Sequence, residues 1–280
     1  MSDQTMAGRT VLVTGASDGI GAETARVLAA KGATVHVTGR SAEKLRPVAE
    51  AVGTKPLVAD FSRLDDVRRL ADQVAERVGT LDLLMNNAGG TFAPKKTTHD
   101  GHEPNFQINH LAPFLLTNLL RDKLAAAGSS LVVNTSSIGN LMGKVVLDDL
   151  DYEHRRAIEF PAYGTGKLMN IVFTRGIAQR WSADGVASAA VHPGPVGSSF
   201  GRDSWLVGLL YRSPLKLLAT ISVPDGAAPL IALAERGPDP EINGRYFSRF
   251  KPDGRENRQA HDQSIIDGLW ERSAALVGLH

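Results

Sequence analysis

The chain of 280 residues contains no cysteine. Without thiols it can form no disulfide bond, use no thiolate nucleophile and bind no metal through sulfur, which fits a reducing compartment. It also lacks any run of about 18 apolar residues, and its polar start, MSDQTMAGRT, lacks an apolar signal region. We therefore expect a cytoplasmic protein with no membrane anchor.

An excess of charge of one sign is also missing, since 31 Lys and Arg residues face 30 Asp and Glu residues. The formal net charge of +1 gives no electrostatic reason to expect nucleic acid or an anionic membrane as a partner. With 42% hydrophobic residues the chain can bury a full core. Repeats, low-complexity tracts and linkers are absent from the sequence, so we predict one globular domain over residues 1–280.

Short apolar runs typical of buried strands alternate with helical patterns along the chain. This alternation indicates βαβ units, and hence an α/β fold with a mainly parallel sheet covered by helices on both faces. We expect the charged run DDLDYEHRR, within 143–159, to be a solvent-exposed excursion. The predicted strands are 10–14, 34–38, 56–59, 81–86, 131–135, 186–192 and 245–247, and the predicted helices are about 20–31, 41–52, 64–78, 103–126, 161–181, 224–236 and 256–276.

A glycine-rich turn follows the first predicted strand, where TGASDGIG places glycines at 15, 19 and 21. Such a turn lets the backbone approach a pyrophosphate, whose charge is stabilised by the N–H groups and dipole of the following helix. The spacing differs from the commoner Gly-x-Gly-x-x-Gly, and an ordinary strand-to-helix turn is the alternative. Its place in the first βαβ unit favours dinucleotide binding.

The end of the second predicted strand, TGRS, carries Arg40 and no acid that could bind a ribose 2′-hydroxyl. An arginine there can pair with a 2′-phosphate, which favours NADP over NAD. The alternative is an arginine that only faces solvent. Asp18, in the glycine-rich turn, disfavours NADP, because a carboxylate beside the 2′-phosphate would oppose its binding.

The stretch YGTGK places Tyr163 and Lys167 one helical turn apart, with Gly164 and Gly166 between them. Each glycine inside a helix costs about 0.5–1 kcal/mol relative to alanine. We expect the glycines to let a cofactor or a facing strand come close. A nearby ammonium favours the ionised form of a phenol, so the pair suits proton transfer. A core tyrosine beside a surface lysine is the alternative.

Seven motifs occur in an order and spacing that resemble the short-chain dehydrogenase/reductase family. They are TGASDGIG, Asp60 after the third strand, NNAG at 86–89, Asn109 in INH, NTSS at 134–137, YGTGK at 163–167 and HPGPVGSS at 192–199. The chain is especially similar to the retinol dehydrogenase-like branch, whose members also carry DDL between the serine and the tyrosine, and a late G-x-YF. Two departures are Gly166, where the family commonly has serine, and Ser198, where it usually has threonine.

The resemblance implies a Rossmann-type, doubly wound sheet of about seven strands in the order 3-2-1-4-5-6-7, with the site at their carboxyl ends. It implies a catalytic set of Asn109, Ser137, Tyr163 and Lys167. In this set Ser137, rather than Ser136, donates a hydrogen bond to the substrate carbonyl, and Tyr163 exchanges the proton. Lys167 donates to the nicotinamide ribose, and Asn109 holds a water that links Lys167 to solvent.

The resemblance also implies how the cofactor is bound. Asn87 to Gly89 pass beside the adenosine ribose, Asp60 binds the adenine edge, and Val196 and Ser198 contact the nicotinamide amide. His99 and His102 lack a third ligand, so we expect no metal. The full predicted cofactor-binding set is Gly15, Ser17, Asp18, Gly19, Ile20, Arg40, Asp60, Phe61, Asn87, Ala88, Gly89, Tyr163, Lys167, Pro193, Gly194, Val196 and Ser198.

We predict an NADP(H)-dependent oxidoreductase that interconverts a carbonyl and an alcohol, with a lipophilic small-molecule substrate. A lid at about 200–222 is expected to close over that substrate, although the apolar stretch 205–221 also suits a contact between subunits of a homo-oligomer. An NAD-dependent alcohol dehydrogenase, a C=C reductase and a non-catalytic dinucleotide-sensing protein are the alternatives.

Overall fold

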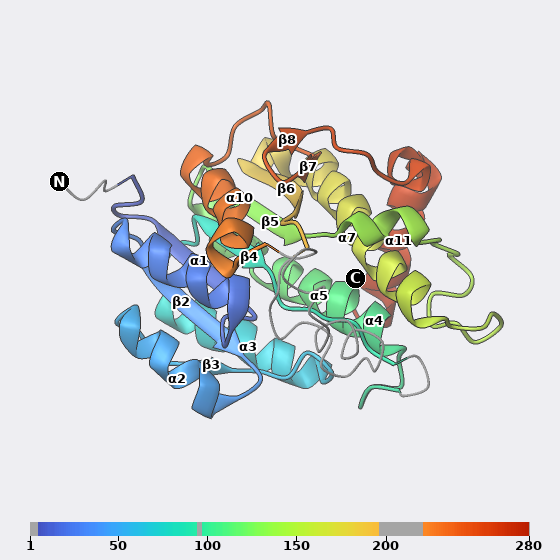
Figure 1. Ribbon diagram of the computed structural model, residues 1–280, viewed down its shortest axis with the longest axis horizontal. Helices are drawn as coiled ribbons and strands as arrows, with labels where there is room; N and C mark the ends of the chain where they lie inside the picture. Colours follow the sequence, from blue (N-terminus) through green and yellow to red (C-terminus); the bar gives the residue numbers. More distant parts are fainter. Residues whose placement is uncertain (1–4, 94–96, 196–220, 280) are drawn as a thin grey trace.

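The computed structural model describes residues 5–93, 97–195 and 221–279 (Figure 1). The strands are β1 (Thr10–Thr14), β2 (Thr34–Gly39), β3 (Leu57–Val58), β4 (Leu83–Asn86), β5 (Ser130–Thr135), β6 (Val186–His192), β7 (Arg245–Ser248) and β8 (Lys251–Pro252). The α-helices are α1 (Gly19–Ala30), α2 (Ala42–Ala51), α3 (Leu64–Arg77), α4 (Pro104–Phe106), α5 (Ala112–Leu119), α6 (Arg121–Ala126), α7 (Glu159–Trp181), α10 (Val223–Arg236) and α11 (Gln263–Leu276). A π-helical turn, η1 (Gln107–Leu111), and the 3₁₀ turns η2 (Ile138–Met142), η3 (Ser182–Asp184) and η4 (Arg258–His261) complete the elements.

The described strands form one sheet in the order β3-β2-β1-β4-β5-β6-β7-β8. The first seven run parallel, which confirms the predicted fold class and strand order. The predicted count of about seven is corrected to eight, because β8 pairs antiparallel with β7. A two-residue strand is too short to produce an alternating pattern in the sequence.

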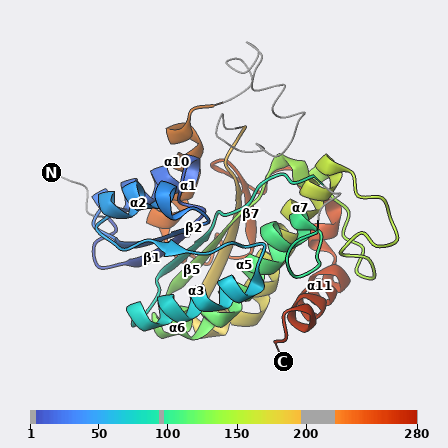
Figure 2. The ribbon, with the colours of Figure 1, turned by 90° about the horizontal axis from the view of Figure 1, so that it is seen from below.

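Helices cover both faces of the sheet, as Figure 2 shows. Val11 and Val13 of β1 belong to the core beneath α1, α2 and α10, whereas Leu12 between them belongs to the core beneath α3, α5, α7 and α11. Successive residues of a strand point to opposite faces, so both sides of each central strand must be apolar. The strands therefore read as continuous apolar runs.

Helix α7 lies at the centre of the second layer and is buried on nearly all sides. Its neighbours are β5, β6, η2 and α11, and an aromatic cluster joins it to α5 and α11. In this cluster the Phe173 ring centroid lies 5.1 Å from that of Phe114 and 5.7 Å from that of Trp270. Because every face of α7 has a partner, the position of each glycine on it is set by what packs there.

The prediction of one continuous helix over 103–126 is wrong. Pro104 begins α4, η1 inserts a π-helical turn at Gln107–Leu111, and the helix is interrupted again at Leu120 before α6. Such π turns distort the hydrogen-bond ladder and are frequent at functional sites. Asn109 lies within this turn. The predicted helix 256–276 is likewise two elements, η4 and α11, separated by Asp262, which caps α11.

The prediction that DDLDYEHRR is a solvent-exposed excursion is right for Asp148, Glu153, His154 and Arg156 but wrong for its other charged residues. Asp149 is buried and accepts hydrogen bonds from the backbone N–H groups of His154 and Arg155. Asp151 lies 2.8 Å from Nδ1 of His102, and the Tyr152 hydroxyl donates to Thr165 on α7. The charges of this segment pair with each other and with neighbouring elements, so its charge pattern does not indicate exposure.

Two buried asparagines link the central strands. Asn86 of β4 and Asn134 of β5 are register partners, and the Asn86 amide donates to the Asn134 carbonyl at 2.9 Å. Asn86 also donates to Thr117 of α5, and Asn134 donates to Thr174 of α7. This buried polar pair lies at the carboxyl ends of its strands, directly before the two loops that carry predicted site residues.

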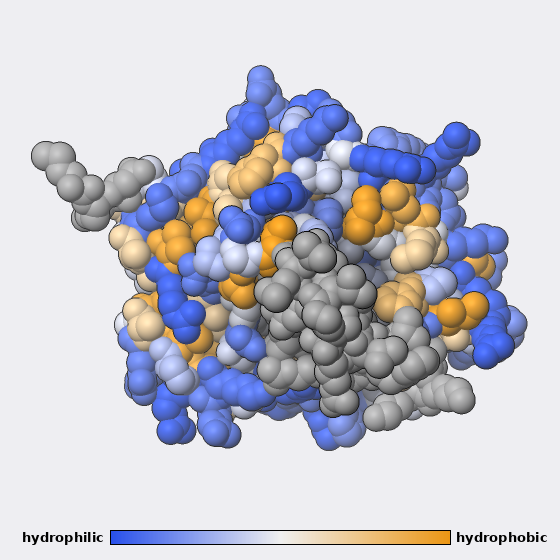
Figure 3. Space-filling model, viewed as in Figure 1, coloured by the Kyte–Doolittle hydropathy of each residue, from blue (hydrophilic) through white to orange (hydrophobic). Residues whose placement is uncertain are grey.

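The surface in Figure 3 is hydrophilic around its outline, with apolar residues in separate groups inside it. Among the described residues, large apolar side chains that are at least two-fifths exposed include Ile138, Met142, Ile158 and Phe250. No described helix is both long enough and apolar enough to cross a bilayer.

Candidate active site

The glycine-rich turn joins β1 to α1 and packs directly against the loop after β4. A methyl group added at Gly15 would lie 2.7 Å from the Ala88 Cα, and one at Gly21 would lie 2.4 Å from the Gly15 carbonyl oxygen. Gly15 has a φ of +66° and Gly19 a φ of +57°. Both the backbone conformation and the close packing therefore require glycine. The two predicted cofactor loops, 15–20 and 87–89, lie side by side.

Thr14 holds the second of these loops in place, a role that the sequence did not indicate. Its hydroxyl donates to the Met85 carbonyl and accepts from the backbone N–H groups of Asn87 and Ala88. The Asn87 amide donates to the Thr14 carbonyl at 3.0 Å. The one feature of the sequence that could have suggested this role is the position of Thr14 directly before the glycine-rich turn.

The turn from β2 brings Arg40 to the same edge of the sheet. A methyl group at Gly39 would lie 2.0 Å from Oγ of Ser17, so β2 ends directly against the glycine-rich turn. Arg40 follows as an exposed side chain. Asp18 is the N-cap of α1, and its carboxylate accepts from the Gly19 N–H at 2.7 Å. Asp18 therefore directs its carboxylate to the first N–H group of the helix.

Asp60 and Phe61 follow β3 at the next position along this edge. One Asp60 carboxylate oxygen accepts from the Ser62 N–H at 2.9 Å. Phe61 is buried in the core, so only its backbone is available to a ligand. Ile20 also packs partly against the core, on α1.

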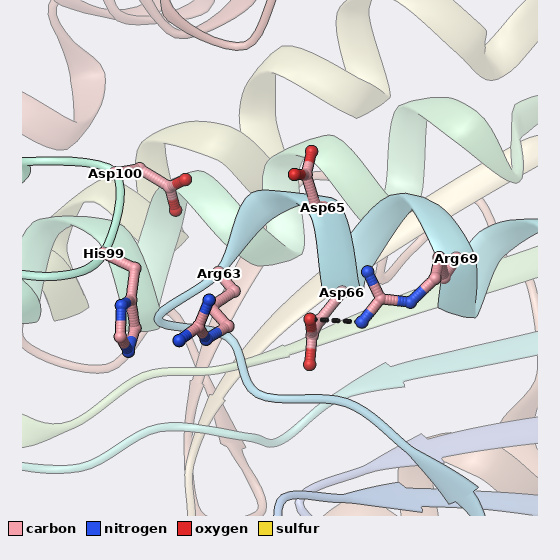
Figure 4. Close-up of a pocket in the computed structure, with 6 residues that line it drawn as sticks. All are labelled: Arg63, Asp65, Asp66, Arg69, His99 and Asp100. Carbon is pink, nitrogen blue, oxygen red and sulfur yellow. Dashed lines mark hydrogen bonds and ion pairs between the residues drawn. The ribbon is translucent and has the colours of Figure 1, made fainter.

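A polar pocket of about 480 Å³ lies just beyond Asp60, at the start of α3 (Figure 4). It contains none of the predicted site residues, and its charged side chains bond among themselves or cap helices, as Asp66 does with Arg69 and Asp100 with the Leu64 N–H. We therefore assign it no catalytic role. It is lined by Arg63, Asp65, Asp66, Arg69, His99 and Asp100.

Ser137 and Tyr163 meet across Gly139. A methyl group at Gly139 would lie 3.2 Å from Cε1 of Tyr163 and 3.5 Å from Oγ of Ser137. The Ser137 hydroxyl is the N-cap of η2 and accepts from the Gly139 N–H at 3.1 Å. With its lone pair engaged there, the hydroxyl proton is available for another acceptor. Ser136, in contrast, donates to the Lys167 carbonyl at 2.7 Å.

Lys167 is 2% exposed and lies on the same face of α7 as Tyr163. Its ammonium nitrogen lies 5.8 Å from the Tyr163 ring centroid and donates to the Thr135 carbonyl at 3.1 Å. Burial lowers the pKa of Lys167 from 10.5 to about 8. The Asn170 amide donates to the same Thr135 carbonyl at 3.0 Å, so one backbone oxygen fixes both side chains.

Asn109 projects from the π-helical turn toward the loop after β4. Its amide donates to the Gly90 carbonyl at 2.9 Å, and its carbonyl accepts from the Gly90 N–H at 3.0 Å. A methyl group at Gly89 would lie 2.4 Å from Oδ1 of Asn109 and 3.1 Å from Nζ of Lys167. All four predicted catalytic residues therefore lie around one site, and Asn109 fixes the loop that borders Lys167.

The glycines of YGTGK serve a different contact from the one expected. A methyl group at Gly164 would lie 2.4 Å from the Gly139 carbonyl oxygen, and one at Gly166 would lie 2.7 Å from the Asn105 carbonyl oxygen. The elements that approach are the η2 turn and α4, and not a strand or a cofactor. Gly164 lets the turn that follows Ser137 pack directly onto the helix that carries Tyr163, and Gly166 does the same for α4.

The loop after β6 completes the edge of the site. Pro193 and Gly194 are buried, and Gly194 has a φ of +106°. Burial lowers the pKa of His192 to about 4, so its neutral ring can accept at Nδ1 from the Gly194 N–H. Predicted contacts Val196 and Ser198 lie outside the described residues, as does nearly all of the predicted lid at 200–222.

The residues at this edge fit a bound dinucleotide. At Gly15 and Gly21 the turn is packed as closely as the backbone allows, directly before α1, and the N-terminus of a helix attracts an anion. The Ser17 hydroxyl is buried and lacks a hydrogen-bond partner among the described residues. Such a donor beside a helix N-terminus suits a phosphate oxygen.

The model of the family described as short chain dehydrogenase matches residues 9–205. Retinol dehydrogenase 13 of Homo sapiens is 35% identical, over 99% of this chain and 87% of the relative. Retinol dehydrogenase 12 of Mus musculus is 38% identical, over 97% and 87%. A candidate daunorubicin C-13 ketoreductase of Streptomyces sp. (strain C5) is also 38% identical, over 97% and 93%.

The fold is similar to that of solved structures of the same kind. An uncharacterized protein from Mycobacterium paratuberculosis has a TM-score of 0.78 and 31% identity, over 98% of this chain and 95% of that one. The active-site complex of Pseudomonas aeruginosa RhlG with NADP has a TM-score of 0.69 at 24% identity, over 89% and 97%. The second likeness concerns the fold alone.

Proposed function

The chain belongs to the short-chain dehydrogenase family and is similar to the retinol dehydrogenases, and on that premise we propose that it is an NADP(H)-dependent enzyme that interconverts a carbonyl and an alcohol. One observation carries the proposal. Ser137 and Tyr163 lie on either side of Gly139, with the buried Lys167 on the same helical face as the phenol. This arrangement supports transfer of a proton to or from a substrate oxygen.

In the reduction direction the nicotinamide, when bound, supplies the hydride that reaches the carbonyl carbon. The Tyr163 hydroxyl gives its proton to the carbonyl oxygen as the C–O bond loses its double-bond character. Ser137 donates a hydrogen bond to the same oxygen and stabilises the charge that develops there. The Lys167 ammonium lies close enough to stabilise the phenolate that remains. Oxidation uses the same groups in reverse.

Three features at the adenosine end support NADP(H) over NAD(H). Arg40 is exposed directly after β2, Gly39 leaves no room for a side chain beside Ser17, and the strand end carries no acid that would bind a 2′-hydroxyl. The opposing residue, Asp18, directs its carboxylate to the Gly19 N–H. A bidentate pair between Arg40 and a 2′-phosphate contributes about 1.5–3 kcal/mol.

The exposed side chains next to Ser137 support a lipophilic substrate. Ile138 is 48% and Met142 55% exposed, and both lie on the η2 turn that begins at Ser137. Apolar side chains that border convergent polar groups are typical of small-molecule sites. The expected lid, homo-oligomer and cytoplasmic location stay predictions, which limited proteolysis, light scattering and cell fractionation can test.

A panel of carbonyl compounds and alcohols, each assayed with NADPH, NADH and their oxidised forms, tests the proposal. We expect turnover of bulky apolar ketones or aldehydes with NADPH, read from the absorbance of the reduced nicotinamide. Turnover of activated alkenes alone would favour C=C reduction instead. Tight NADPH binding with no turnover anywhere in the panel would favour a dinucleotide sensor.

A further inference from the structure

The turn that carries Ser137 is held from a distant part of the chain. After β8 the chain runs past α7 to α11, shown in red in Figure 1, and residues 257–259 contact the stretch 140–145. The Asn257 amide donates to the Gly143 carbonyl at 2.8 Å and to the Asn140 carbonyl at 3.3 Å. The Asn257 N–H donates to the Asn140 side-chain carbonyl at 2.9 Å.

Asn140 transmits this contact to the serine. It is fully buried, and its amide donates to the Ser137 carbonyl at 2.8 Å, while its backbone N–H donates to the same oxygen at 3.0 Å. The side chain of Asn140 thus accepts from Asn257 on one side and donates to Ser137 on the other. A continuous chain of hydrogen bonds connects residue 257 to residue 137.

Both N–H groups of the Asn257 side chain and its carbonyl oxygen are engaged. Its carbonyl accepts from the Gln259 N–H and so caps η4, while its amide spans two carbonyls of the serine turn. Gln259 makes a second pair of bonds nearby, accepting from the Val145 N–H and donating to the Val145 carbonyl, both at 2.9 Å. The side chains of Asn257 and Gln259 therefore bind backbone groups of the turn. Such contacts fix the path of the chain and do not depend on the side chains that the turn carries.

We propose that Asn257 is a positioning residue for the reaction, which acts through Asn140 to hold the Ser137 hydroxyl at the correct distance from the Tyr163 phenol. The inference rests on the proposed function, because it assumes that Ser137 and Tyr163 share a substrate oxygen. Ser137 lies on a short 3₁₀ turn, which has poorer hydrogen-bond geometry than an α-helix and gains from outside support. Displacement of a reacting group by about 1 Å can cost about 100-fold in rate.

The test replaces Asn257 by aspartate, which keeps the acceptor that caps η4 and the backbone N–H bond to Asn140, but removes the two hydrogen bonds that the side chain donates to the Asn140 and Gly143 carbonyls. Asn243→Asp is the matched control, since the Asn243 amide also joins two elements, accepting from the Ser188 N–H and donating to Ser182, at a place that contacts none of the site residues. We expect Asn257→Asp to lower kcat about 10- to 100-fold. We expect the Kd of Asn257→Asp for NADPH to stay within about twofold of wild type, and the turnover of the control Asn243→Asp to do the same.

A double-mutant cycle with Ser137→Ala separates positioning from a general loss of structure. If Asn257 acts through the serine, Asn257→Asp has no further effect on turnover once the hydroxyl is gone. A loss that persists in full in the Ser137→Ala background would overturn the proposal, as would unchanged kcat in Asn257→Asp alone. Asn140→Asp, which removes the bond to the Ser137 carbonyl directly, should repeat the result if Asn257→Asp folds poorly.

Hydrogen exchange keeps this inference separate from the proposed function. If the wild-type protein turns over no substrate, the proposed function fails, but the contact between residues 257 and 140 is still testable. Backbone N–H groups of Asn140 and Gly143 should then exchange faster in Asn257→Asp than in Asn243→Asp. Equal protection of residues 138–143 in the two variants would show that Asn257 does not hold the turn.

Discussion

The two halves of the sheet position their predicted site residues in different ways. In the half predicted to bind the dinucleotide, residues 10–93 (the dinucleotide half), Thr14 of the neighbouring strand holds Asn87 and Ala88 after β4, and Asn109 holds Gly90. In the catalytic half, which comprises residues 97–195 and 221–279, Ser137 depends on Asn257, more than a hundred residues away. In both halves, contacts between residues far apart in the chain hold the site loops, but the glycine-rich turn of the first half gives a local sequence signal, whereas the contact of Asn257 with the serine turn gives none.

The largest expected effect concerns the proton donor of the catalytic half. Tyr163→Phe keeps the packing of the ring and removes the proton, so turnover should fall about 1,000-fold while the Kd for NADPH is unchanged. Steady-state kinetics and a fluorescence titration measure the two quantities. Tyr152→Phe, which loses only a hydrogen bond to Thr165, is the control. More than about a tenth of wild-type turnover in Tyr163→Phe would refute the role of the phenol.

A backbone contact of the dinucleotide half should give the next largest effect. Gly21→Ala places a methyl group 2.4 Å from the Gly15 carbonyl oxygen, which forces the turn away from α1. Overpacking of this kind costs about 1–3 kcal/mol, so we expect NADPH and NADH to bind about 10- to 100-fold more weakly. Gly79→Ala, where nothing lies within 4 Å of the added methyl, should bind both cofactors normally. Equal affinities in the two variants would contradict the predicted phosphate-binding turn.

Arg40 should affect only one of the two cofactors. We expect wild-type protein to bind NADPH about 10- to 100-fold more tightly than NADH, Arg40→Asp to reverse that order, and Asp18→Arg to tighten NADPH further. Calorimetric titration gives the dissociation constants. Arg46→Asp makes the same change of charge on the exposed side of α2 and should change neither constant. Equal constants for NADPH and NADH in the wild type would show that Arg40 merely faces solvent.

The smallest expected effect is on the free energy of unfolding. It distinguishes the halves because, among the predicted site residues, the buried lysine belongs to the catalytic half. Since burial holds the pKa of Lys167 near 8, below its ordinary value of 10.5, the unfolded chain binds more protons between those values and stability rises with pH there. Lys167→Met should therefore raise the free energy of unfolding at pH 7 by about 1–2 kcal/mol while abolishing turnover.

Urea denaturation at several pH values checks this prediction. The gain from Lys167→Met should be full below pH 8 and shrink as the pH rises toward 10.5. Lys44→Met, on the exposed side of α2, should show no such dependence. If the increase in the free energy of unfolding were the same at every pH from 8 to 10.5, loss of the buried charge at residue 167 would not be its cause.

The strands themselves could be predicted from apolar runs of neighbouring residues, whereas their order and the roles of the candidate site residues followed from the resemblance to the family. Apolar runs identified β1, β2 and β6 within a residue of their bounds. The glycines at 15 and 21 and the pair Tyr163 and Lys167 are likewise motifs of a few residues. What such motifs do not contain is the partner that each residue meets in the folded chain.

That limit explains the errors. Gly164 and Gly166 were expected to face a cofactor or a strand, but they face η2 and α4, and nothing between residues 160 and 174 indicates those neighbours. Asp151 was expected in solvent because charge is usually exposed, yet its partner His102 lies far along the chain. Asn257 stands in a polar stretch without periodicity, so no sequence signal identified it.

The buried pair of Asn86 and Asn134 has a consequence for folding. A strand that slips by one residue exchanges its two faces, and in an otherwise apolar sheet such a slip can be tolerated because both faces of β4 and β5 are hydrophobic. Here the slip would break the hydrogen bond from the Asn86 amide to the buried Asn134 carbonyl, and a buried polar group left unpaired costs about 1–3 kcal/mol. The asparagines therefore favour one register of β4 and β5. In that register the loops after the two strands begin next to each other.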